Sequence, residues 1–111
     1  MKRRKIERSV LVELRRIYPR ASRSWLKRSL KRASSVARKS ENLWIVHGMK
    51  SMGDYYDVYY VRRKGKKYVC SCQEPPRKFH NVRSRGYCTH IGAVLAFQLV
   101  EKLSAARKKR G

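Results

Sequence analysis

Apolar side chains in the N-terminal part of the chain recur at the spacing of two amphipathic helices. Between residues 6 and 18 they return every three or four positions, and Pro19 ends this pattern because the residue before a proline disfavours the helical conformation. A second apolar stripe runs from Trp25 to Ala37, and either Ser22 or Ser24 is a suitable N-cap for it. The pattern predicts an αα-hairpin.

The pattern changes to that of β-strands in the middle of the chain. Leu43–His47, Tyr55–Arg62 and Lys67–Cys72 are rich in aromatic and β-branched residues, which suit a pleated sheet. Short connections between them predict an antiparallel meander of three strands. A last helix is expected from about Cys88 to Arg107, with apolar residues nearly all round, so it should be buried on several sides. Either the N-terminal helices or a second copy of the chain, in a homodimer, would cover it.

These elements predict an α+β protein in which an N-terminal αα-hairpin, a three-stranded antiparallel β-meander and a C-terminal helix surround the three cysteines of the chain. The length of 111 residues is that of a single domain. Residues 1–40 would be a basic helical extension and residues 41–108 a ββ(β)α domain that contains these cysteines. We expect the two parts to form one compact unit, because no Gly/Pro/Ser-rich linker separates them.

The second expected strand leaves one question open. Side chains alternate along a strand, so Tyr56 and Tyr60 share one face while Tyr55 and Tyr59 share the other. Either helices cover both faces, or one face is a platform on which unpaired bases stack.

The metal site is predicted from two pairs of residues that flank a loop. Cys70-Ser71-Cys72 is followed by fifteen residues and then by Cys88-Thr89-His90. Alternate residues of a strand point to one face, so Cys70 and Cys72 can reach the same ion. Cys88 and His90 flank the expected start of the last helix, where free N–H groups favour thiolate. Three thiolates and one imidazole are the ligands of a structural zinc site, and we expect one zinc per chain.

One alternative ligand and one class of function follow from the same residues. His80 lies in the loop between the two pairs and could replace His90. A zinc ion with four protein ligands has no open position for a reacting water, and the chain has neither paired carboxylates at a suggestive spacing nor a Gly-rich phosphate loop. We therefore expect no enzymatic activity.

The sequence resembles the SWIM zinc finger over about residues 42–105. Leu43–Val46 resembles the family's W-x-V strand, Tyr56–Val58 its Y-x-V strand, and Cys70–Cys72 its C-S-C segment. The stretch Gly86–Ile91 is similar to the family's G-x-C-x-H-I motif. The resemblance implies a DNA-binding or protein-interaction module, since SWIM domains occur in Mutator-type transposases, bacterial partners of chromatin-remodelling ATPases, ubiquitin ligases and recombination accessory factors.

This chain departs from the family pattern in the loop between the ligand pairs. Gln73 and Glu74 stand before Pro75, whereas the family has proline soon after the second cysteine, and the loop is longer than in many members.

The charge of the chain points to a polyanionic partner. Thirty Lys and Arg against seven Asp and Glu give a net charge of +23, and such an excess destabilises a compact state unless anions neutralise it. DNA is the expected partner, bound mainly through phosphates and with weak sequence selectivity, as in a chromatin, plasmid or viral protein. RNA binding, or docking of a SWIM adaptor on a larger protein in recombination or transposition, is the alternative. The basic residues expected to contact nucleic acid are Arg23, Lys27, Arg28, Lys31, Arg32, Lys64, Lys66, Lys67, Arg77, Lys78, Arg83 and Arg85.

The hydropathy of the chain argues against a membrane protein. The basic N-terminus is not followed by the apolar core of a signal peptide, and the longest apolar run, Ile91–Val100, is too short to span a bilayer. Three cysteines, an odd number, favour a metal site in a reducing compartment over disulfides. We expect an intracellular protein of the cytoplasm or nucleoid, or of the nucleus in a eukaryote.

Overall fold

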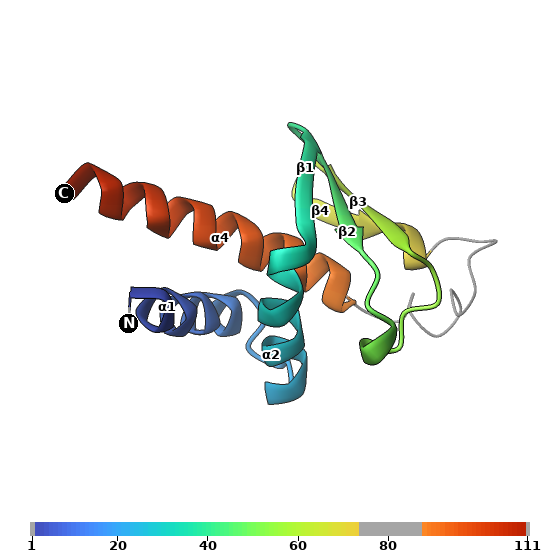
Figure 1. Ribbon diagram of the computed structural model, residues 1–111, viewed down its shortest axis with the longest axis horizontal. Helices are drawn as coiled ribbons and strands as arrows, with labels where there is room; N and C mark the ends of the chain where they lie inside the picture. The colour runs from blue at the N-terminus through green and yellow to red at the C-terminus, as the bar shows by residue number, and fades with distance from the viewer. Residues whose placement is uncertain (1, 74–87, 111) are drawn as a thin grey trace.

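The computed structural model describes residues 2–73 and 88–110 and has the α+β class expected from the sequence. A long C-terminal helix runs between a β-sheet on one side and two N-terminal helices on the other (Figure 1). In chain order the elements are α1 (Lys2–Ile17), α2 (Arg23–Arg32), β1 (Val36–Ser40), β2 (Leu43–His47), β3 (Val58–Lys64), β4 (Lys67–Cys70) and α4 (Thr89–Arg110).

The two N-terminal helices begin and end where local sequence signals place them. Helix α1 ends at Ile17, two residues before Pro19. Ser22 is the N-cap of α2, and its side chain accepts a hydrogen bond of 3.0 Å from the backbone N–H of Trp25. The prediction of two helices joined by a short turn is confirmed, and Ser22 rather than Ser24 is the cap. A single turn of 3-10 helix connects α2 to strand β1 of the sheet (Figure 1).

The sheet has four antiparallel strands in the order β1-β2-β3-β4, so the prediction of three strands was incomplete. The additional strand, β1, occupies residues that were expected to extend α2. Helix α2 ends at Arg32, a single turn of 3-10 helix follows, and Val36 then pairs with Val46 of β2. Val36 is buried in this position, so pairing with β2 takes it into the sheet core instead of leaving it on a helix.

The strand boundaries also differ from the expected ones, and among the described residues helix covers one face of the sheet. Strand β3 begins at Val58 rather than Tyr55, and β4 ends at Cys70. On β3 the inward-facing Tyr59 is buried, whereas Tyr60 points outward and keeps 43% of its surface exposed. The interpretation in which helices cover both faces is therefore wrong for the face that carries Tyr60.

Two hydrophobic cores lie on opposite sides of the first half of α4. One contains the inner face of the sheet, with Trp44 and Val61, together with Ile91 and Val94 of α4. The other joins α1 and α2 to α4 and includes Leu14. The N-terminal helices and the sheet thus bury this half of α4 within a single chain, as expected for a helix that is apolar nearly all round.

Helices α2 and α4 approach each other closely at Gly92. A Cβ atom built on Gly92 would lie 2.0 Å from Oγ of Ser29 and 2.8 Å from the ring of Trp25, so only glycine permits this contact. Ser29 itself is fully buried.

In the described ranges, the helices lack an apolar segment of the length needed to cross a membrane.

Candidate metal centre

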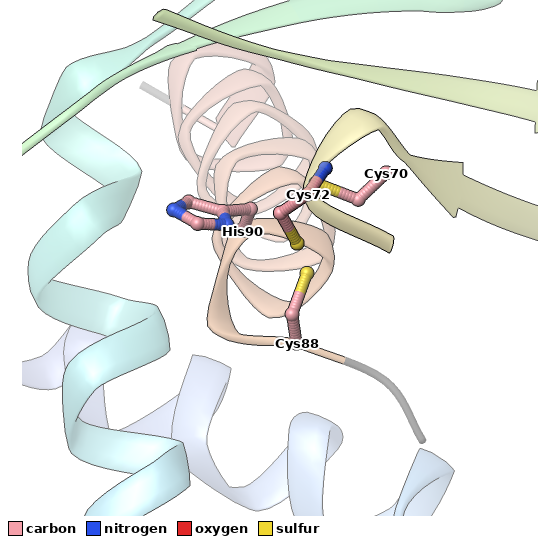
Figure 2. A group of neighbouring side chains, drawn as sticks. All are labelled: Cys70, Cys72, Cys88 and His90. Carbon is pink, nitrogen blue, oxygen red and sulfur yellow. The ribbon is translucent and has the colours of Figure 1, made fainter. Parts of the chain in front are cut away.

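Four potential metal ligands converge where the end of the sheet meets the start of α4 (Figure 2). Cys70 is the last residue of β4, and Cys72 lies in the turn of 3-10 helix that follows it. Cys88 directly precedes α4, and His90 is in the first turn of that helix. One ligand atom from each side chain can be chosen so that all four lie within 4.8 Å of one another, which allows a single ion to be held by all of them.

The way in which Cys70 and Cys72 converge differs from the expectation. Alternation along a strand was expected to align them, but the strand stops at Cys70 and the chain turns before Cys72. In this turn the backbone N–H of Cys72 points to the sulfur of Cys70 at 3.5 Å. Such N–H···S contacts stabilise thiolate, so the turn supports a pair of metal-binding sulfurs as well as bringing them together.

His90 is oriented by a buried carboxylate that sequence reasoning missed. Its Nε2 atom lies 3.0 Å from Oδ1 of Asp54, and because a carboxylate only accepts hydrogen bonds, Nε2 carries the proton. The Nδ1 atom then has a free lone pair, and it is buried without a hydrogen-bond partner. Burying a nitrogen in this way destabilises the fold unless the nitrogen binds a hydrogen-bond donor or a metal ion. Metal coordination through Nδ1 accounts for it, since metal-bound histidines commonly donate their other N–H to a carboxylate.

The ring of His90 is also fixed by stacking on Tyr59. The two ring centroids are 3.9 Å apart and the planes differ by 17°. The hydroxyl of Tyr59 accepts hydrogen bonds of 3.1 Å from the backbone N–H groups of Tyr55 and Tyr56. The position of the imidazole is thus set by an aromatic ring that is itself held in place by the segment before β3.

Asp54 is held in turn by the guanidinium of Arg32. Both Nη atoms of Arg32 donate to the carboxylate, the bond from Nη2 to Oδ1 measuring 3.1 Å, and the backbone N–H of Met49 donates to Oδ2 at 2.7 Å. Burial alone would raise the pKa of Asp54, but the hydrogen bonds from His90, Arg32 and Met49 outweigh it and keep this pKa well below its ordinary value. The carboxylate is therefore charged and pairs with a charged Arg32.

This ion pair corrects one expectation about nucleic-acid contacts. Arg32 was expected to face a phosphate backbone, but only 1% of its surface is exposed. It lies seven residues after Trp25 and three after Ser29, both buried, so helical periodicity places it on the inner face of α2.

The three thiols form one interacting group. Hydrogen bonds from Cys70 and Cys72, followed by the backbone N–H groups of Ile91 and His90 at the start of α4, lower the pKa of Cys88 below its ordinary value. The same contacts with Cys72 and Cys88, together with burial, raise the pKa of Cys70. A bound cation would stabilise all three thiolates, which is the form in which cysteine binds metals.

The structure places the remaining predicted residues as follows. On α2, Arg23, Lys27, Arg28 and Lys31 are exposed, and so are the hairpin residues Lys64, Lys66 and Lys67. Arg77, Lys78, Arg83 and Arg85 lie outside the described residues, as does the alternative ligand His80. The third histidine, His47, is exposed at the end of β2 and does not belong to the cluster.

The fold and this site define an α+β protein with a Cys₃His cluster, half-buried at Cys88 and buried at the other three residues, that is compatible with a metal ion. No family model, curated protein or solved structure matches the chain.

Proposed function

We propose that the cluster binds one structural zinc ion and that the protein is a small SWIM-type zinc finger. The donor set supports zinc over magnesium or calcium, because three of the four ligands are soft sulfurs and none is a carboxylate. The unpartnered Nδ1 of His90, aligned by Asp54, is the observation that most favours a bound metal. With four protein ligands the ion has no open position, so its role is to stabilise the fold.

Zinc binding is tested by elemental analysis of purified protein. We expect one zinc per chain and unfolding of the sheet and of the start of α4 on chelation, since binding energy at such a site is folding energy. His90→Ala should lower zinc affinity, and the matched variant His80→Ala should leave it unchanged. Well-folded protein without metal would contradict the proposal, and the opposite behaviour of the two variants would exchange the roles of the histidines.

We further propose that the protein binds DNA, mainly through its phosphates. The net charge of +23 is the observation that carries this proposal. In the described part of the chain, the exposed basic residues of α2 have no carboxylate within ion-pair distance. Like charges on one helix face repel each other and destabilise the helix, and here no carboxylate offsets this repulsion. These side chains remain available to an external anion. They are Arg23, Lys27, Arg28 and Lys31.

A salt titration of duplex binding tests the second proposal. Affinity measured by fluorescence anisotropy should fall steeply with salt, by roughly 10³–10⁵ between 50 and 200 mM if six to ten phosphates are contacted. Lys27→Glu with Lys31→Glu should weaken binding and flatten the salt dependence by about one unit per lost contact. The control, Lys50→Glu with Lys102→Glu, makes the same change of charge away from this face and should have a smaller effect. Equal losses in both double variants would mean that α2 is not the contact surface.

Competition separates the proposed function from its alternatives. Structured RNA that displaces duplex DNA at equal salt would favour an RNA-binding protein. Retention of a protein partner after nuclease treatment, with no measurable affinity for DNA, would favour the adaptor.

A further inference from the structure

The outer face of the sheet is the part of the structure that the proposed function leaves unexplained. Alternation along β3 turns Tyr59 and Val61 into the core, so Tyr60, Arg62 and Lys64 project from the opposite face. Both Tyr60 and Arg62 are exposed. A face that carries an exposed aromatic ring beside two cations differs from α2, whose exposed face has cations but no aromatic residue.

Around Tyr60 the outer face is apolar at its floor and hollowed. The cross-strand partners Ile45 and Val69 belong to the neighbouring strands, Ile45 opposite Tyr60 and Val69 opposite Arg62, and both are half-buried. A hollow of about 300 Å³ is lined by Tyr60, Arg62, Lys64, Val69 and Ser71. The hydroxyl oxygen of Ser71 accepts a hydrogen bond of 3.0 Å from the backbone N–H of Tyr60, which fixes one wall of this hollow to β3.

Of the described residues that line this hollow, the charged ones, Arg62 and Lys64, are both cations. None of the four strands contains an acidic residue, whereas β3 alone contains Arg62, Arg63 and Lys64. Among the described residues, no carboxylate lies within ion-pair distance of Arg62 or Lys64. An occupant of this face should therefore be an anion that also presents a flat apolar surface.

We propose that the outer face of the sheet binds a single strand of DNA, with an unpaired base stacked on Tyr60 and its phosphates beside Arg62 and Lys64. Bases in a duplex are already stacked on their neighbours, so only an unpaired strand offers a free ring face. Successive outward side chains of β3 are about 7 Å apart. Over this spacing an extended single strand of DNA can place a base against one side chain and a phosphate against the next. This inference rests on the proposed binding of DNA and adds a second surface, distinct from α2, that selects unpaired bases.

The test compares single-stranded and duplex DNA in the zinc-loaded protein. Affinity for an oligothymidine of about 12 nucleotides is measured by fluorescence anisotropy beside a duplex of equal length. Tyr60→Ala should weaken binding to the single strand by roughly 5- to 20-fold, the lower part of the range for one stacked base, and leave duplex binding unchanged. Tyr60→Phe keeps the ring and should bind as the parent does. The matched control is Tyr55→Ala, which removes another exposed tyrosine, 56% accessible, from the loop before β3.

The salt dependence separates stacking from charge. Stacking releases no counterions, so Tyr60→Ala should leave the salt slope for the single strand unchanged. Arg62→Gln should instead lower that slope by about 0.7 if one phosphate contact is lost. Zinc content and thermal unfolding of each variant report whether the sheet is intact.

Each result has a definite meaning. Equal affinity of the parent protein and Tyr60→Ala for the single strand would overturn this inference while leaving duplex binding through α2 intact. If the parent protein binds neither form of DNA, the proposed function fails and this inference fails with it. An oligouridine that binds more tightly than the oligothymidine would overturn the choice of DNA as the occupant.

Discussion

Asp54→Asn is the most informative perturbation of this protein, because one carboxylate joins a candidate metal ligand to the N-terminal helices. Oδ1 accepts from His90 and from Arg32, and Oδ2 accepts from Arg32 and from the backbone of Met49. Asparagine has a single oxygen. The NH₂ group that replaces the other oxygen cannot accept a hydrogen bond, so at least one of these donors loses its acceptor. The guanidinium of Arg32 also loses its counter-charge.

The cost of this change can be worked out from the burial of the pair. The side chains of Arg32 and Asp54 are 2% and 0% exposed, so removing one charge leaves the other buried without compensation. Breaking a buried ion pair in this way costs about 3–5 kcal/mol. With an m-value of about 1.5 kcal/mol/M, the midpoint of urea unfolding should fall by about 2–3 M. The zinc affinity should fall as well, by roughly 10- to 100-fold, as for loss of a partner that orients a metal-bound histidine.

Two assays separate these effects. Urea unfolding followed by circular dichroism at fixed zinc concentration gives the stability, and competition with a chromophoric chelator gives the zinc affinity. The double variant Arg32→Met with Asp54→Leu replaces the ion pair by apolar side chains, which is often neutral or stabilising. It should regain much of the lost stability but not the zinc affinity, because Nε2 of His90 still lacks its acceptor. A double variant that binds zinc as tightly as the parent would refute the argument that Asp54 aligns His90 for metal binding.

Further predictions concern helix packing and the proposed DNA contacts. Gly92→Ala should destabilise the protein by about 1–3 kcal/mol in urea unfolding, because the added methyl group overlaps Ser29, and an unchanged midpoint would show that α2 moves freely away from α4. Ser22→Ala should cost about 1 kcal/mol in the same assay through loss of the N-cap, and a cost near zero would mean that the cap is satisfied by water. Arg83→Glu with Arg85→Glu should weaken duplex binding without changing zinc content, and parental affinity at moderate salt would remove this loop from the proposed contact surface.

The four residues of the Cys₃His cluster could be singled out from the sequence because their signal is local. Cys70 and Cys72 are two residues apart, and so are Cys88 and His90, and each pair stands at the boundary of a well-defined element. The strand Leu43–His47 was predictable for the same reason, and the N-cap of α2 could be narrowed to Ser22 or Ser24. Local patterns determine these features, and tertiary contacts do not override them.

Strand β1 could not be predicted in the same way, because its sequence is compatible with a helix. Val36 follows Ala33 and Leu30 at helical spacing, and Ala37, Arg38 and Lys39 are common in helices. The strand exists because Val36 and Ala37 pair with β2, an interaction between segments that no single window of sequence reveals. Tertiary pairing decides the conformation where local preference is weak.

Asp54 lies 36 residues before His90 and has no motif around it. Its hydrogen bond to His90 could therefore not be predicted from the sequence. Arg32 is different, since its position could have been derived. The buried positions Trp25 and Ser29 predict a further inward position at residue 32, which shows that helical periodicity is a better guide than charge to which side of α2 a basic residue faces.

Two of the described carboxylates form ion pairs between distant parts of the chain. Asp54 pairs with Arg32 of α2, and Glu101 of α4 lies 3.1 Å from Arg38 of β1. Both ion pairs connect the N-terminal forty residues to later elements, and β1 belongs to the same sheet as β2, so the expected boundary at residue 40 falls at the end of a strand within one sheet. The folding of the N-terminal helices and the order of the Cys₃His cluster should therefore depend on each other. Among the described residues, these carboxylates form no ion pair with the exposed cations of α2 and β3, which stay available for the proposed phosphate contacts.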